Sequence, residues 1–122
     1  MIPELCPAAK SDWFFPDMYL PDLSDGVSHE ALCVLNVGRE DAHITLTLYF
    51  EDADCMDGFH AVCPGSRTNH IRLDKIRGGD GTAIPQCRPY AGWLHSDVPV
   101  LCQYTRVDAA LPDHALMTAM GL

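Results

Sequence analysis

The stretch Ser28–Phe50, with the sequence SHEALCVLNVGREDAHITLTLYF, decides the fold and predicts a two-stranded β-hairpin. Its first half contains the apolar run Ala31–Leu35, which is typical of a strand covered on both faces. Its second half alternates apolar and polar residues with a period of two, which fits a strand and fits a helix badly. We expect one face of that strand to be buried in a fixed register. The members of the buried row are Ile44, Leu46, Leu48 and Phe50.

Length and composition indicate one soluble domain spanning residues 1–122. No run approaches the roughly 18 consecutive apolar residues that a membrane-spanning helix needs. The N-terminus lacks the basic and apolar segments of a signal peptide, so we expect a cytoplasmic protein with reduced cysteines. A close approach of Cys55 and Cys63 across a turn remains the alternative.

The formal net charge of −9 is unevenly distributed along the chain. Residues 1–66 contain twelve acidic residues against only Lys10 and Arg39, whereas most basic residues lie in the second half. An acidic surface opposes the neutralisation of several phosphates at once, so DNA binding is a weak hypothesis.

The rest of the chain contains further short strand patterns separated by turn signals. Trp13–Pro16 fits an edge strand, and Ser96-Asp97 fits a turn between two later strands. Residues 112–120 fit either a helix that begins at Pro112 or a last strand. The further predicted strands are 59–63, 67–73, 90–95 and 98–107. About seven to eight short strands predict an all-β fold, an antiparallel β-sandwich.

Several motifs together closely resemble the sensory rhodopsin transducer family. They are Ser28-His29-Glu30, Cys33–Asn36, Glu40–His43, Arg67–Arg72, Asp97–Val100 and Gln103–Asp108. The resemblance implies a small cytoplasmic β-sandwich, similar to carbohydrate-binding modules, that assembles as a homotetramer. It also implies signalling from a membrane receptor, a sensory rhodopsin, with a sugar-like ligand or DNA as other suggested partners. The chain departs from the family at Asp17-Met18, where Glu-Gly is usual, and at Tyr104, where His is usual.

The polar and aromatic residues that these motifs carry are the candidate ligand-binding or assembly residues. They are Trp13, Tyr19, His29, Glu30, Arg67, His70, Arg106 and Asp108. Trp13 and Tyr19 could stack on a ligand or simply pack over the sandwich. The arginines could bind an anion, or form structural Arg106–Glu30 and Arg67–Asp108 pairs.

The motifs predict no catalytic residue, metal ligand or cofactor. The chain has no G-x-S-x-G motif and no cysteine with an activating partner nearby in sequence. The histidines lack the close spacing of a metal site. We therefore expect a non-catalytic signalling adaptor, with a small-ligand-binding module as the alternative.

Overall fold

The computed structural model describes residues 6–109 and 115–122, and every regular element in these residues is a β-strand. The strands are β1 (Lys10–Tyr19), β2 (His29–Asn36), β3 (Ala42–Phe50), β4 (Met56–Cys63), β5 (Arg67–Arg72), β6 (Pro89–Asp108) and β7 (Ala115–Met120). All the strand pairs are antiparallel, which confirms the predicted all-β class. Residues 115–120 are a strand, whereas the alternative helix start at Pro112 lies outside the described residues.

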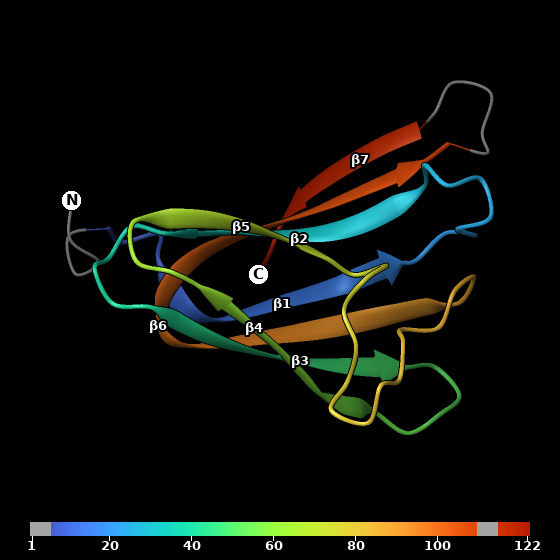
Figure 1. The fold of residues 1–122 in the computed structure, drawn as a ribbon, viewed down its shortest axis with the longest axis horizontal. Helices are drawn as coiled ribbons and strands as arrows, with labels where there is room; N and C mark the ends of the chain where they lie inside the picture. Colours follow the sequence, from blue (N-terminus) through green and yellow to red (C-terminus); the bar gives the residue numbers. More distant parts are fainter. Residues whose placement is uncertain (1–5, 110–114) are drawn as a thin grey trace.

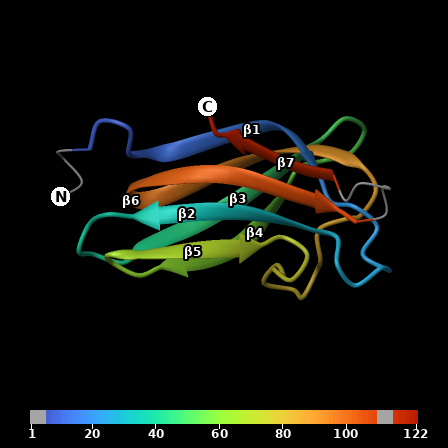
Figure 2. The same ribbon diagram turned by 90° about the horizontal axis from the view of Figure 1, so that it is seen from above.

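The strands form two facing layers that share the long strand β6 (Figure 1). Layer A contains β1, the first half of β6, β3 and β4, paired in that order. Layer B contains β7, the second half of β6, β2 and β5, which lie side by side in Figure 2. The sheet is thus folded over on itself, and the core fills the space between the layers.

Strand β6 passes from one layer to the other without a turn, so the predicted turn at Ser96-Asp97 is wrong. Ser96 is fully buried because the inward-facing alternation runs from Tyr90 through it and continues to Tyr104. Pro99 lies between the end of the β3 ladder and the start of the β2 ladder. Proline lacks an N–H, so this gap in strand pairing accepts it without the loss of a ladder hydrogen bond.

The predicted hairpin is also wrong in its pairing, although both of its strands exist. Strand β2 pairs with β5 and β6, while β3 pairs with β4 and β6, so the connection crosses between layers. The fully buried Asn36 stabilises this crossing, because its Nδ2 donates to the carbonyls of Glu40 and Cys63. Gly65 packs so closely on the crossing that an added Cβ would lie 2.0 Å from the Arg39 carbonyl oxygen.

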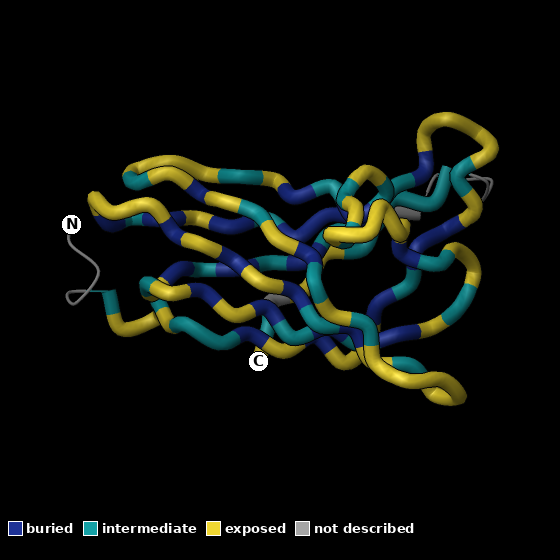
Figure 3. The backbone as a smooth tube through the Cα atoms, turned by 60° about the horizontal axis from the view of Figure 1, so that its bottom comes forward, coloured by how far each residue is buried: buried dark blue, intermediate teal, exposed yellow. Residues whose placement is uncertain are grey.

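The alternating row of β3 faces the core as predicted. Figure 3 shows the same alternation of buried and exposed positions along the strands in general. Ile44, Leu46 and Leu48 are buried, and Phe50 packs against them half-exposed. Each fully buried side chain of this kind contributes about 1.5–3 kcal/mol. The outer face of β2 is covered only in part, since Ala31 is buried there whereas Leu35 is 44% exposed.

Candidate functional site

A fully buried carboxylate, that of Glu30 on β2, lies between the two layers. It accepts hydrogen bonds from the phenols of Tyr90 and Tyr104 and from the backbone N–H of Tyr19 at 2.9 Å. Tyr90 belongs to the layer A half of β6 and Tyr104 to the layer B half. Glu30 therefore connects both halves of the shared strand to β1 and β2.

Burial raises the pKa of the Glu30 carboxyl, and its three hydrogen-bond donors oppose that shift only in part. Burial also raises the pKa of Tyr104 and of Tyr90, with the Glu30 charge acting in the same direction. Both phenols therefore remain protonated donors at neutral pH. This arrangement is a structural clamp whose polar groups are satisfied by one another.

Arg106 lies directly opposite Glu30 in the β2–β6 register, but within the described residues the two form no direct ion pair, and the Arg106 charge only acts to lower the Glu30 pKa, which burial raises. The guanidinium lies 5.6 Å from the centre of the Tyr19 ring, and its Nη2 is 3.6 Å from the Met117 sulfur. Asp108 lies near enough to Tyr19 for its charge to contribute to a raised Tyr19 pKa, whose largest cause is desolvation. The structure thus brings Tyr19, Glu30, Arg106 and Asp108 to one end of the sandwich.

Among the remaining predicted residues, His29 borders this cluster, directly opposite Val107, whereas Arg67, His70 and Trp13 lie apart from it. Arg67 pairs in register with Asn36, at the opposite end of β2 from Asp108, so these two residues do not pair within one chain. His29 bonds through Nδ1 to the Val27 carbonyl at 2.9 Å. Trp13 is buried and donates to the Val100 carbonyl at 2.9 Å, so it packs in the core and offers no stacking surface.

His70 lies on the outer face of layer B, directly opposite Cys33. Both residues line a shallow cavity of about 280 Å³, together with Thr68 and Gln103. Among the residues that the structure describes, no cluster of three or more His, Cys, Asp or Glu side chains could hold a metal ion. The same residues contain no apolar helix of membrane-spanning length.

The outer face of layer A carries an ordered aromatic surface, which we call the aromatic platform: Phe14, Trp93 and His95. The Phe14 and Trp93 rings are stacked, with centroids 6.0 Å apart and planes 12° apart. The His95 ring meets Trp93 edge-on at 6.3 Å. Phe14 is 47% exposed, so the platform is open to solvent.

Asp12 fixes the orientation of the platform. Its Oδ1 accepts hydrogen bonds from Trp93 Nε1 and from His95 Nδ1, each at 2.8 Å. The hydrogen bond from His95 is the largest cause, and the bond from Trp93 the second, of a pKa of the Asp12 carboxyl below its usual range. A second acid–imidazole pair, Asp97 with His43 at 2.9 Å, lies further along the same face.

The sequence marks Phe14 as an aromatic that either packs or stacks, but it does not indicate that Trp93 and His95 join it. Phe14 and Trp93 both lie in recognised strand patterns, and the register places them directly opposite each other. The available signal was the alternation in Trp13–Phe15, in which one of two neighbouring aromatics must face outward. That alternation by itself does not decide whether Trp13 or Phe14 is the outward residue.

Comparisons with known proteins agree on one family. The sequence profile of the family described as Anabaena sensory rhodopsin transducer matches residues 8–122. The solved structure of the Thermotoga maritima protein 1070 is similar, with 38% sequence identity and a TM-score of 0.80, and the match covers 92% of each chain. The solved Anabaena sensory rhodopsin transducer is 32% identical with a TM-score of 0.71, over 83% of this chain and 92% of its own. No curated protein sequence matches the chain.

Proposed function

Because this chain belongs to the Anabaena sensory rhodopsin transducer family, we propose that it is a non-catalytic signalling adaptor that works through protein–protein contacts. The adaptor works in the cytoplasm as a homotetramer. Its partner is the cytoplasmic side of a sensory rhodopsin or a similar membrane receptor. The docking surface is the outer face of layer A around the aromatic platform.

The observation that carries this proposal is the Phe14–Trp93 pair, which is stacked, exposed and held in place by Asp12. Tryptophan and other large aromatics supply much of the binding energy in protein interfaces. A side chain that is already ordered loses little conformational entropy on binding, which favours affinity. The platform is therefore suited to be the centre of a docking surface.

A small-ligand module is the second candidate, and the same platform supports it. A sugar ring could stack on Trp93 or Phe14 while the neighbouring Asp12 and His95 contact its hydroxyl groups. A thermal-shift screen against sugars, nucleotides and organic acids distinguishes the two roles, because a bound ligand raises the unfolding midpoint. The adaptor role predicts no shift with any of these compounds.

The direct test measures binding to a microbial sensory rhodopsin reconstituted in lipid nanodiscs. Trp93→Ala should weaken binding by at least about tenfold, because hot-spot truncations cost 2 kcal/mol or more. The matched control is Leu35→Ala, which removes an exposed apolar side chain from the outer face of layer B and should bind normally. Equal binding by Trp93→Ala and the unaltered protein would contradict the proposal.

Light scattering on the same variants separates docking from assembly. The proposal predicts a tetramer for the unaltered protein and for Trp93→Ala alike. A Trp93→Ala protein that dissociates into smaller species would identify the platform as a subunit interface instead.

A further inference from the structure

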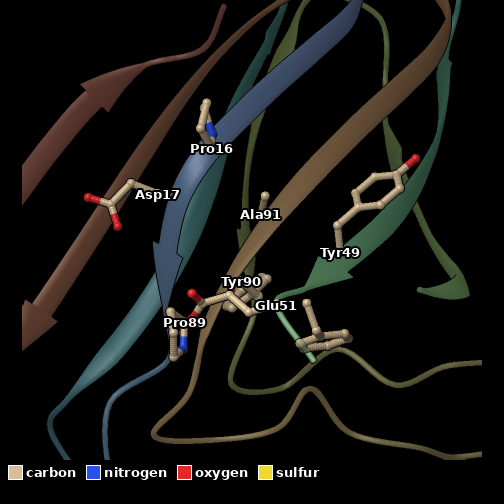
Figure 4. Close-up of a pocket in the computed structure, with 8 residues that line it drawn as sticks. Pro16, Asp17, Tyr49, Glu51, Pro89, Tyr90 and Ala91 are labelled. Atoms are coloured by element: carbon tan, nitrogen blue, oxygen red, sulfur yellow. The ribbon is translucent and has the colours of Figure 1, made fainter. Parts of the chain in front are cut away.

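A cavity of about 380 Å³ lies on the outer face of layer A, where β1 and β3 end (Figure 4). Ala91 on β6 forms its floor, with Tyr49 of β3 directly opposite. On the other side of Ala91, β1 has an irregularity that places Pro16 and Asp17 between the partners of Gly92 and Tyr90. The small side chain of Ala91 between these larger residues leaves the hollow.

The chemistry of the cavity favours a cation. Two acidic residues, Asp17 and Glu51, belong to its lining, together with Tyr49, which is 44% exposed. Figure 4 shows Tyr49 and Asp17 on opposite sides of Ala91, with the Asp17 carboxylate directed outward from β1 and Glu51 reaching across beside Pro89. Among residues 6–109 and 115–122, no lysine, arginine or histidine belongs to the lining. Within the described residues, neither of the two carboxylates forms an ion pair.

The chain already binds one of its own arginines in this way beside the cavity. The guanidinium carbon of Arg88 lies 4.6 Å from the centre of the Phe50 ring. Its Nη2 donates to the Asp52 carboxylate at 2.7 Å. Phe50 and Asp52, which follow Tyr49 and Glu51 directly in the sequence, thus bind an arginine with an aromatic face and an adjacent carboxylate. Guanidinium groups suit such sites because they stack on rings and hydrogen-bond to carboxylates in the same plane.

We propose that the cavity formed by Asp17, Tyr49, Glu51 and Ala91 receives an arginine side chain of the partner protein. The assignment rests on the proposed adaptor role, since it names the chemistry of the partner. Ala91 and Trp93 are two residues apart on β6 and face the same side, so one partner covers both the cavity and the aromatic platform. The strongly acidic first half of the chain, which supplies all but one of these four residues, attracts such a partner.

The test uses short blocked peptides and NMR on the full chain. The peptide acetyl-Gly-Arg-Gly-amide should shift the backbone amide signals of Tyr49, Glu51 and Ala91. The citrulline peptide, which has nearly the same shape without the charge, should not. The lysine peptide should bind more weakly than the arginine peptide, because an ammonium group cannot both stack and bind two oxygens in one plane.

Charge-removing variants locate the site. Asp17→Asn and Glu51→Gln are nearly isosteric changes at exposed positions and should each weaken binding of the arginine peptide about two- to fivefold. Glu40→Gln is the matched control, since Glu40 is an exposed carboxylate in the 37–41 connection, at the opposite end of β3. It should leave binding unchanged. Equal binding of the citrulline peptide, or shifts confined to other residues, would overturn the proposal.

Two further outcomes distinguish this proposal from the adaptor role. If rhodopsin binding is lost in Trp93→Ala but unaffected by Asp17→Asn with Glu51→Gln, the adaptor role stands and the cavity assignment fails. If the arginine peptide binds as described and rhodopsin does not, the cavity assignment stands and the receptor proposed above is wrong. If the cavity amides instead shift with protein concentration alone, a second copy of the chain occupies the site, which contradicts the proposal.

Discussion

The Asp12 carboxylate accepts a hydrogen bond from the Trp93 indole at 2.8 Å, although 81 residues separate them in the chain. The two side chains meet because β1 and β6 are adjacent in layer A, with Asp12 in register with His95. A partly exposed tryptophan is thereby held in one orientation beside Phe14. Removing the acid should release the indole without unfolding the protein.

We expect Asp12→Ala to cost about 1–2 kcal/mol of stability, since two hydrogen bonds at a partly exposed site are lost. Acrylamide should then quench Trp93 fluorescence more efficiently, while the buried Trp13 contributes a constant background. The control is Glu40→Ala, which removes an exposed carboxylate far from either tryptophan. Unchanged quenching in Asp12→Ala would show that stacking on Phe14 alone orders the indole.

The Glu30 clamp should be the most sensitive polar site in the fold. Glu30→Ala leaves two phenols and one N–H without their acceptor, so we expect a loss on the order of 3 kcal/mol or more. Tyr104→Phe removes only one of these bonds and should cost about 1.5–3 kcal/mol, the range for a bond to a charged group. Urea unfolding measures both losses. If Glu30→Ala lost less stability than Tyr104→Phe, Glu30 would not be the shared acceptor of these hydrogen bonds.

Because the pKa of Glu30 is raised, its contribution to the free energy of unfolding falls as the pH rises. Between the ordinary value of 4.5 and the raised pKa, the folded state binds more protons at this site than the unfolded state. The contribution of Glu30 is therefore largest below pH 4.5 and is lost as the pH rises through the raised pKa. The stability difference between the unaltered protein and Glu30→Gln should shrink along this pH range. A difference that grows with pH would mean a lowered pKa.

Thiol reactivity tests the burial of the cysteines. Burial raises the pKa of Cys102 to about 12, so its thiol is neither accessible nor ionised at pH 8, which is a working pH for iodoacetamide. Cys55 and Cys87 are exposed and should be alkylated in the folded protein. Mass spectrometry after brief alkylation reads each site separately. Early labelling of Cys102 would contradict its position between the layers.

The core row of β3 provides a matched pair of variants. Leu46→Ala should destabilise the protein by about 2–5 kcal/mol, because it removes a buried side chain and leaves a cavity. Thr45→Ala, one position along and facing outward, should change stability by no more than about 0.5 kcal/mol. Equal effects would mean that the strand faces the other way.

Much of the strand content could be predicted from local alternation, because side chains on a strand alternate between two faces whatever the partner strand is. The partner strands could not be predicted in the same way. The Asn36–Asp41 region fits a hairpin turn equally well, and the crossing depends on contacts distant in sequence, such as that of buried Asn36 with a carbonyl 27 residues away. The turn predicted at Ser96-Asp97 was wrong for a similar reason. Both residues are common in turns, but Ser96 is small enough for the core to bury it within β6.

Residues of the candidate site could be predicted only where they belong to the sequence motifs of the family. Glu30, Arg106 and Tyr19 were identified from the sequence and do lie together. Tyr90 lies 60 residues and Tyr104 lies 74 residues from Glu30, so their role as its donors depends on the fold of β6. Of the two alternatives for Trp13, packing is the one that the structure shows, and alternation alone could not decide it because it does not say which face meets the core.

Fluorine NMR of the protein labelled with 5-fluorotryptophan tests the docking surface most directly, since the chain contains only two tryptophans. The buried Trp13 serves as an internal reference, and Trp93→Phe assigns the two signals. If a sensory rhodopsin docks on the aromatic platform, its addition in nanodiscs should change the chemical shift of the Trp93 signal and leave the Trp13 signal in position. Binding that leaves the Trp93 signal in place would contradict the account.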